Sequence, residues 1–133
     1  MRRALLTTTI ATVICTWAAP AHAAAPLAGT SWEFERMAGR ALEPDYDASL
    51  RFGRDGIFGG RNACNSIGGH YRAGRVRLRF ARTWSTLVGC ESEGRGHDLF
   101  GVLHRTRAYR RTARRLVLIG AGGRVLARLA RER

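Results

Sequence analysis

The sequence predicts a mainly β (α+β) domain: a small curled antiparallel sheet or open barrel of seven to eight strands with one helix. Short runs that alternate apolar and polar residues recur along the chain, which is typical of antiparallel strands with one face in water. Glycine-containing turns separate these runs. Apolar residues at helical spacing stand out only in residues 98–107, so the helix enters late in the order.

The first half of the chain is expected to supply strands joined by turns. In the first strand Trp32 and Phe34 alternate with acidic residues and should face the core. Asp55-Gly56 is a strong hairpin turn, because glycine readily adopts the positive φ that such turns need. The predicted strands are residues 30–37, 49–52, a third beginning at 57–58, and 70–73, with a polar connection over 41–47.

The cleanest alternation in the chain is at residues 76–80. Val76, Leu78 and Phe80 are predicted to face the core, and the arginines between them to face water. After it we expect an extended segment at residues 83–89, a linker at 91–96 and the helix at 98–107. Two strands at 108–112 and 115–119, a glycine turn at 120–123, a last strand at 124–129 and a frayed end at 131–133 complete the chain.

Two glycine pairs, Gly59-Gly60 and Gly68-Gly69, are expected to bracket a loop that carries Cys64 and Asn65. Paired glycines permit backbone conformations that other residues avoid, or the close approach of another segment. Gly60 and Gly69 are therefore candidate positions for a structural or a binding role.

Residues 1–23 are predicted to be a secretory signal peptide, which leaves residues 24–133 as the domain. A short basic start precedes an uncharged apolar run and a small-x-small site, which predicts cleavage after Ala23. The alternatives are a retained membrane anchor, which the short apolar run disfavours, and a lipoprotein. The lipoprotein is disfavoured because Ile14 precedes Cys15 where a small residue is expected. We expect a periplasmic or secreted protein.

The chain carries a formal net charge of +13, and all of its basic residues are arginine. Such a charge can indicate a nucleic-acid partner. The arginines are spread along the chain rather than clustered, and the protein is predicted to be exported, so no nucleic acid is expected. Attraction to an anionic lipid surface explains the charge better than a nucleic-acid partner does. A basic surface that is simply exposed to water explains it better than either.

Removal of the leader leaves two cysteines, Cys64 and Cys90. In an oxidising compartment an even pair predicts one disulfide. It would close a loop of about 27 residues, worth roughly 3.5 kcal/mol in the chain-entropy model. The alternative is a thiol switch, which the absence of a Cys-x-x-Cys motif disfavours.

Four motifs lie in order along nearly the whole of residues 24–133. They are LAGTSW at residues 27–32, a phenylalanine with an Asp-Gly turn and glycine at 52–60, Cys-Asn followed by Gly and Tyr71 at 64–71, and STLVGC at 85–90. Together they resemble the META domain, also called the HslJ-like heat-shock protein family. An apolar-faced helix and a final Leu-x-Leu with a glycine turn also fit this family.

The resemblance implies a secreted or membrane-anchored β-rich domain, linked with stress response and in some members with antibiotic resistance or motility. It implies no established catalytic reaction. The chain departs from the family pattern at Ala63, where glycine is usual, and at Val88, where methionine is usual. We expect Ala63 to exclude a strongly positive φ, so that the loop would bend differently.

Asn65 and Thr86 are the polar residues of most interest. Their side chains are expected to hold the loop by hydrogen bonds, with contact to a ligand or partner as the alternative. Trp32, Trp84 and Tyr71 are expected in the core or at its rim rather than in a binding cage.

The sequence offers no catalytic or metal site. Ser66 and Ser85 lack a nucleophile-elbow motif, with His70 as a bare candidate base. The potential metal ligands lack the close spacing of a zinc site (Cys64, Cys90, His70, His97 and His104). The acidic residues considered as catalytic pairs lie in polar connections (Asp45, Asp47, Glu91 and Glu93).

The function that these patterns favour is non-catalytic: an exported, stress-associated envelope domain that binds or interacts. The candidate partners are an envelope component, a small apolar ligand inside the curled sheet, or an anionic lipid surface. The alternative functions are a thiol-disulfide redox protein and a protein that binds anionic membrane surfaces. We expect a monomer without cofactor or metal.

Overall fold

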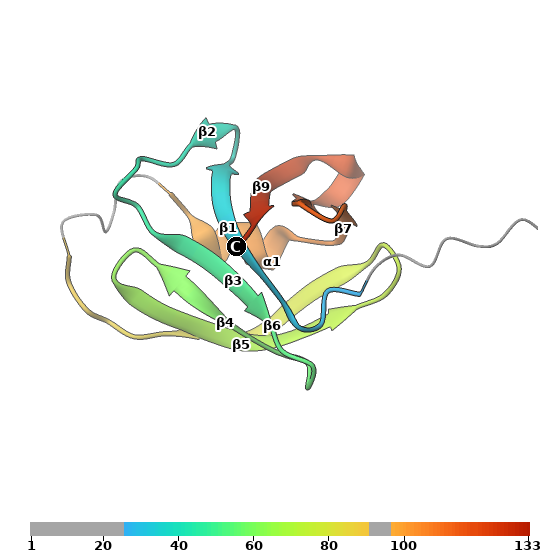
Figure 1. Cartoon of the computed structure of the whole chain (residues 1–133), viewed down its shortest axis with the longest axis horizontal. Coiled ribbons are helices and arrows are strands. Elements are labelled where there is room, and N and C mark those ends of the chain that lie inside the picture. The colour runs from blue at the N-terminus through green and yellow to red at the C-terminus, as the bar shows by residue number, and fades with distance from the viewer. Residues whose placement is uncertain (1–25, 91–96) are drawn as a thin grey trace, which may run out of the picture.

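The computed structural model describes residues 26–90 and 97–133 and is drawn in Figure 1. Its elements are, in order, β1 (Thr30–Met37), β2 (Arg40–Ala41), β3 (Ala48–Phe52), β4 (Ile57–Asn62), β5 (Asn65–Ala73), β6 (Leu78–Ser85), α1 (Leu99–Arg105), β7 (Ala108–Arg111), β8 (Arg115–Ile119), the 3-10 turn η1 (Ala121–Gly123) and β9 (Val125–Arg131). The predicted leader with its cut site, Cys15 and the 91–96 linker with Glu91 and Glu93 lie outside the described residues.

The strands form one antiparallel sheet in the order β6-β5-β4-β3-β1-β9-β8-β7, with the two-residue β2 paired to β1. The sheet curls until its two ends meet at one point, where Arg77 and Ala108 form a β-bridge. Elsewhere along this seam α1 packs against β6 and β9, and Figure 1 shows it beside the curved layer of β3 to β6. The predicted fold class, a curled antiparallel sheet with one helix, is confirmed.

The concave side of the sheet is filled with its own side chains. Phe52, Phe58, Tyr71 and Phe80 form an aromatic cluster with ring centroids 5.0 to 6.1 Å apart. Around it lie fully buried aliphatic residues from the strands and α1, including Leu50, Leu78, Leu99, Leu103, Leu116, Leu118 and Leu129. Each such side chain contributes about 1.5–3 kcal/mol of burial free energy. A small apolar ligand inside the sheet therefore gains no support from the structure.

Two details of strand register differ from the prediction. Val76 was expected in the core but is 62% exposed, because β6 begins only at Leu78 and Val76 lies in the turn beside the bridge. Its carbonyl accepts a hydrogen bond from the Tyr109 amide. Arg131 was expected in a frayed end but belongs to β9 and pairs with Trp32.

The glycine pairs flank the Cys64 loop, and the loop is shorter than predicted, so that the pairs lie inside β4 and β5. A Cβ on Gly60 would stand 1.9 Å from the Ser49 carbonyl oxygen, and one on Gly69 would stand 2.8 Å from the Phe58 ring. These glycines therefore allow the close approach of neighbouring backbone and side chain where the sheet bends.

The loop between β4 and β5 is only Ala63 and Cys64, since Asn62 pairs with Asn65. Ala63 has φ +55°, so the expectation that alanine would exclude a positive φ is wrong. A two-residue hairpin of this kind needs a positive φ at a central position, and the flanking ladder imposes it. Ala63 is also buried, which is consistent with its place in the hydrophobic core.

Candidate functional site

The predicted cysteine pair is joined in the structure. Cys64, in the β4–β5 loop, and Cys90, five residues beyond the end of β6, form a disulfide with an Sγ–Sγ distance of 2.10 Å and Cα atoms 6.2 Å apart. Cys64 Sγ also lies 3.2 Å from the Val88 carbonyl oxygen. This is a sulfur–oxygen contact and not a hydrogen bond, because the oxidised sulfur carries no proton.

Asn65 and Thr86 reinforce this disulfide. The buried Asn65 amide donates to the Val88 carbonyl at 3.1 Å and accepts from the Val88 N–H at 2.6 Å and the Thr86 hydroxyl at 3.0 Å. The Thr86 hydroxyl in turn accepts from the Ser66 N–H at 3.0 Å. The Asn65 side chain thus pairs with Val88 as a neighbouring strand would. We call the disulfide with Asn65 and Thr86 the clamp, and its internal bonds fit the predicted structural role.

Tyr71 and Trp32 lie in the core, as expected. The Tyr71 hydroxyl donates to the Gly53 carbonyl, and burial, with a smaller contribution from Asp55, raises the pKa of Tyr71. The Trp32 indole is fully buried and donates to the Thr30 hydroxyl at 2.7 Å. Two guanidinium groups stack on it, those of Arg111 and Arg131, with Cζ atoms 5.5 and 5.2 Å from the ring centroid.

The histidines and serines weighed as chemical groups are dispersed. His97 Nε2 lies 2.7 Å from the Glu43 carboxylate, and this hydrogen bond holds the pKa of Glu43 below its usual value. His104 Nε2 lies 3.1 Å from the Thr83 hydroxyl. Ser85 donates to the Thr86 carbonyl at 2.7 Å. Within residues 26–90 and 97–133, no three His, Cys, Asp or Glu side chains are grouped so that they could hold a metal ion.

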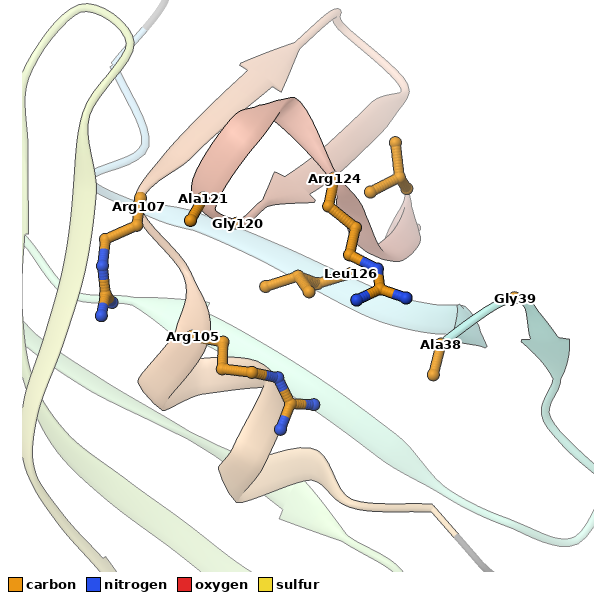
Figure 2. Close-up of a pocket in the computed structure, with 9 residues that line it drawn as sticks. Ala38, Gly39, Arg105, Arg107, Gly120, Ala121, Arg124 and Leu126 are labelled. Carbon is orange, nitrogen blue, oxygen red and sulfur yellow. The ribbon is translucent and has the colours of Figure 1, made fainter.

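A surface cavity of about 720 Å³ lies where the end of α1, the η1 turn and the β1–β2 turn meet (Figure 2). We call it the arginine pocket. Figure 2 shows Arg105 and Arg124 reaching toward each other, with Leu126 between them and Ala38 and Gly39 on a third side. The residues that line it include three arginines and no carboxylate: Ala38, Gly39, Arg105, Arg107, Gly120, Ala121, Arg124, Val125 and Leu126.

Local folding of two connections brings these arginines together. Helix α1 begins at the Asp98 cap, whose carboxylate accepts the Gly101 N–H at 2.8 Å, and ends at Arg105. The chain then turns into β7, and the Arg107 N–H bonds to the Ile119 carbonyl at 2.8 Å. On the facing side, Gly122 and Gly123 have φ of +67° and +79°, which turns β8 back into β9 and sets Arg124 at the rim.

The three arginines differ in what their guanidinium groups contact. Arg107 donates to the His104 and Thr106 carbonyls at 2.7 and 3.0 Å, which satisfies the end of α1, and in Figure 2 it points away from the other two. Arg105 has only a distant ion pair with Asp98, at 3.6 Å, between exposed groups. Arg124 has no ion pair or side-chain hydrogen bond within the described residues.

The arrangement suits an anion with an apolar part. Arg105 and Arg124 are like charges beside one cavity, so a bound anion would relieve their repulsion and accept charge-assisted hydrogen bonds. Leu126 is buried beneath them and offers an apolar floor. The sequence did not point to this pair, because no sequence spacing relates residues 105 and 124.

The fold and its clamp define a small β half-barrel domain with one packed helix and one disulfide. The META domain family model matches residues 25–133, and the chain belongs to the META domain family.

Solved structures have the same fold at low sequence identity. A crystal structure of a DUF4847 family protein from Bacteroides vulgatus has a TM-score of 0.61 at 15% identity, with 78% of this chain and 93% of that one covered. An NMR structure of a protein from Burkholderia xenovorans has a TM-score of 0.59 at 18% identity, covering 92% and 99%. These likenesses concern the fold alone. None of the curated proteins compared with the chain matches it.

Proposed function

We propose that this protein is an exported, non-catalytic binding domain of the cell envelope that takes an anion-bearing, partly apolar ligand in the arginine pocket. The observation that carries the proposal is the pair Arg105 and Arg124, which face one cavity with an apolar floor and no carboxylate in its lining. Guanidinium groups of this kind bind carboxylate or phosphate oxygens by paired hydrogen bonds.

Export and a link to stress complete this proposal. The signal-like residues 1–23 support export, and so does a disulfide of the kind that persists in oxidising compartments. The stress link comes from the resemblance to the META domain family. Among the described residues, no helix has the length and apolar character to cross a membrane.

The clamp gives less support to the alternative function, a thiol-disulfide redox protein. Reduction would leave residues 86–90 joined to the β4–β5 hairpin only by the hydrogen bonds of Asn65 and Thr86, and would remove roughly 3.5 kcal/mol of stabilisation in the chain-entropy model. A redox protein instead needs a low-pKa thiolate that is accessible to its partner. If the purified protein, reduced and then assayed, catalysed the reduction of a second protein's disulfide, the redox alternative would replace the binding proposal.

The proposal is tested by calorimetric titration of the full chain with decyl phosphate, below its micelle concentration, beside inorganic phosphate and decanol. The amphiphile should bind more tightly than either part alone, since it engages both the arginines and the apolar floor. Arg124→Gln should weaken binding by about tenfold, the expected loss of one charge-assisted hydrogen bond. Arg110→Gln is the matched control, because Arg110 is exposed in β7 and does not line the pocket.

An equal loss of affinity in Arg124→Gln and Arg110→Gln would show that binding follows net charge alone, and would overturn the proposal. Binding of decanol as tight as that of decyl phosphate would overturn the role of the arginines. Both outcomes are read from the same titrations.

A further inference from the structure

Within residues 26–90 and 97–133, three of the five exposed large apolar side chains lie on one short segment, residues 84–88. Leu87 is 94% exposed, and Trp84 and Val88 are 54% and 53% exposed. Large apolar side chains grouped on the surface mark sites of interaction with proteins or membranes. The arginine pocket does not include these residues, so the segment calls for its own explanation.

The clamp holds this segment in place. Thr86 and Val88 form hydrogen bonds with Asn65. Two residues after Val88, Cys90 forms the disulfide with Cys64. The Trp84 indole lies on Gly68, where an added Cβ would stand only 2.5 Å from the indole Cζ2. Leu87, between the two residues bonded to Asn65, is thus presented outward from a fixed backbone. A fixed presentation reduces the conformational entropy lost on binding.

Arginines lie before and beside the segment. Residues 76–84 contain three arginines and no acidic residue, and the acidic residues next along the chain are Glu91 and Glu93, after Cys90. Arg82 is exposed two positions before Trp84, and Arg51 lies in the same cross-strand row as Trp84, through Gly59 and Gly68. Within residues 26–90 and 97–133, neither Arg82 nor Arg51 has an ion pair or a side-chain hydrogen bond.

We propose that Trp84, Leu87 and Val88 form a wedge that inserts into the surface of an anionic lipid bilayer, with Arg82 and Arg51 near the headgroups. Tryptophan is favoured at the boundary between headgroups and acyl chains. Basic residues are drawn to anionic leaflets, and stable attachment usually needs both an apolar and an electrostatic contribution. The formal net charge of +13 supplies long-range attraction to the same surface.

Tryptophan quenching by brominated acyl chains tests the wedge. The full chain with Trp17→Phe is mixed with vesicles of phosphatidylglycerol and phosphatidylcholine, so that only Trp32 and Trp84 fluoresce. Trp32 is fully buried and should not be quenched, whereas Trp84 should be. Adding Trp84→Phe should abolish the quenching. Absence of quenching in vesicle-bound protein would show attachment through the leader or through charge alone, and would overturn the wedge.

Vesicle partitioning supplies the second arm. Leu87→Ser should lower partitioning by about tenfold, because an inserted leucine side chain is lost. Val76→Ser is the matched control, since Val76 is also exposed but lies in the turn before β6. Equal losses in the two variants would contradict the proposal. Unchanged binding to pure phosphatidylcholine vesicles would remove the electrostatic part. These results do not depend on decyl phosphate binding, so failure of the wedge and failure of the pocket are distinguishable.

Discussion

The clamp and the arginine pocket contain polar groups in opposite conditions. In the clamp, the Asn65 amide makes three hydrogen bonds to residues 86 and 88. Cys64 and Cys90 are bonded to each other in the disulfide. In the pocket, Arg105 has one distant ion pair and Arg124 none within the described chain. Polar groups that satisfy one another stabilise a fold, whereas like charges left beside a cavity favour an external partner. The comparison separates structural residues from candidate binding residues.

The largest expected effect is loss of the disulfide. The double variant Cys64→Ser/Cys90→Ser should lower the free energy of unfolding by roughly 3.5 kcal/mol, because the open loop regains entropy in the unfolded chain. Urea denaturation of the oxidised protein and the variant measures the difference. The variant should keep decyl phosphate binding when it is folded, since neither cysteine lines the pocket. A loss of stability below 1 kcal/mol would contradict the structural role of the clamp.

A smaller effect is expected from Asn65→Ala. The substitution leaves the Val88 N–H and carbonyl without their partner. A fully buried polar group that loses its partner lowers the free energy of unfolding by about 1–3 kcal/mol. Because Val88 is half exposed and water can replace part of the loss, we expect about 2 kcal/mol in urea denaturation. Asn62→Ala is the control, because Asn62 also belongs to this hairpin but bonds to Tyr46. Equal effects would show that Asn65 has no special place.

The smallest effect on stability is expected in the pocket. Arg124→Gln should change the free energy of unfolding by no more than about 0.5 kcal/mol, because surface charges contribute little. The sign should be stabilising at low salt, since the substitution removes repulsion from Arg105, and the change should shrink as salt screens it. A destabilisation above 1 kcal/mol in thermal and urea unfolding would place Arg124 among the structural residues, beside Asn65.

Strand positions were predicted well where local alternation decides them. The bounds of the first strand, residues 30–37, and of the strand at residues 115–119 agree with β1 and β8. Prediction was poorer where one segment depends on another. Val76 has the apolar side chain of a core residue, but the bridge between Arg77 and Ala108 places it outside the sheet. Ala63 adopts its positive φ because the ladder on both sides demands it, against its own preference.

The candidate sites divide in the same way. The pairing of Cys64 with Cys90 followed from their number and the expected compartment, and it is confirmed. The supporting role of Asn65 was predicted from the hydrogen-bonding chemistry of its amide. That its partner is the backbone of Val88 was not predicted. The arginine pocket was not foreseen at all. Its members come from the β1–β2 turn, the end of α1, the η1 turn and the start of β9, which range from residue 38 to residue 126 along the chain.

By itself the sequence determined the antiparallel β character of this protein, the late helix and the pairing of its two remaining cysteines. These follow from residue type and short-range spacing, which act wherever the chain is. Only the tertiary structure decided that Arg105 and Arg124 share a cavity, that Val76 lies outside the core and that Leu87 projects from a fixed segment. Those properties arise when a curled sheet brings distant segments together, and no local pattern specifies how far it curls.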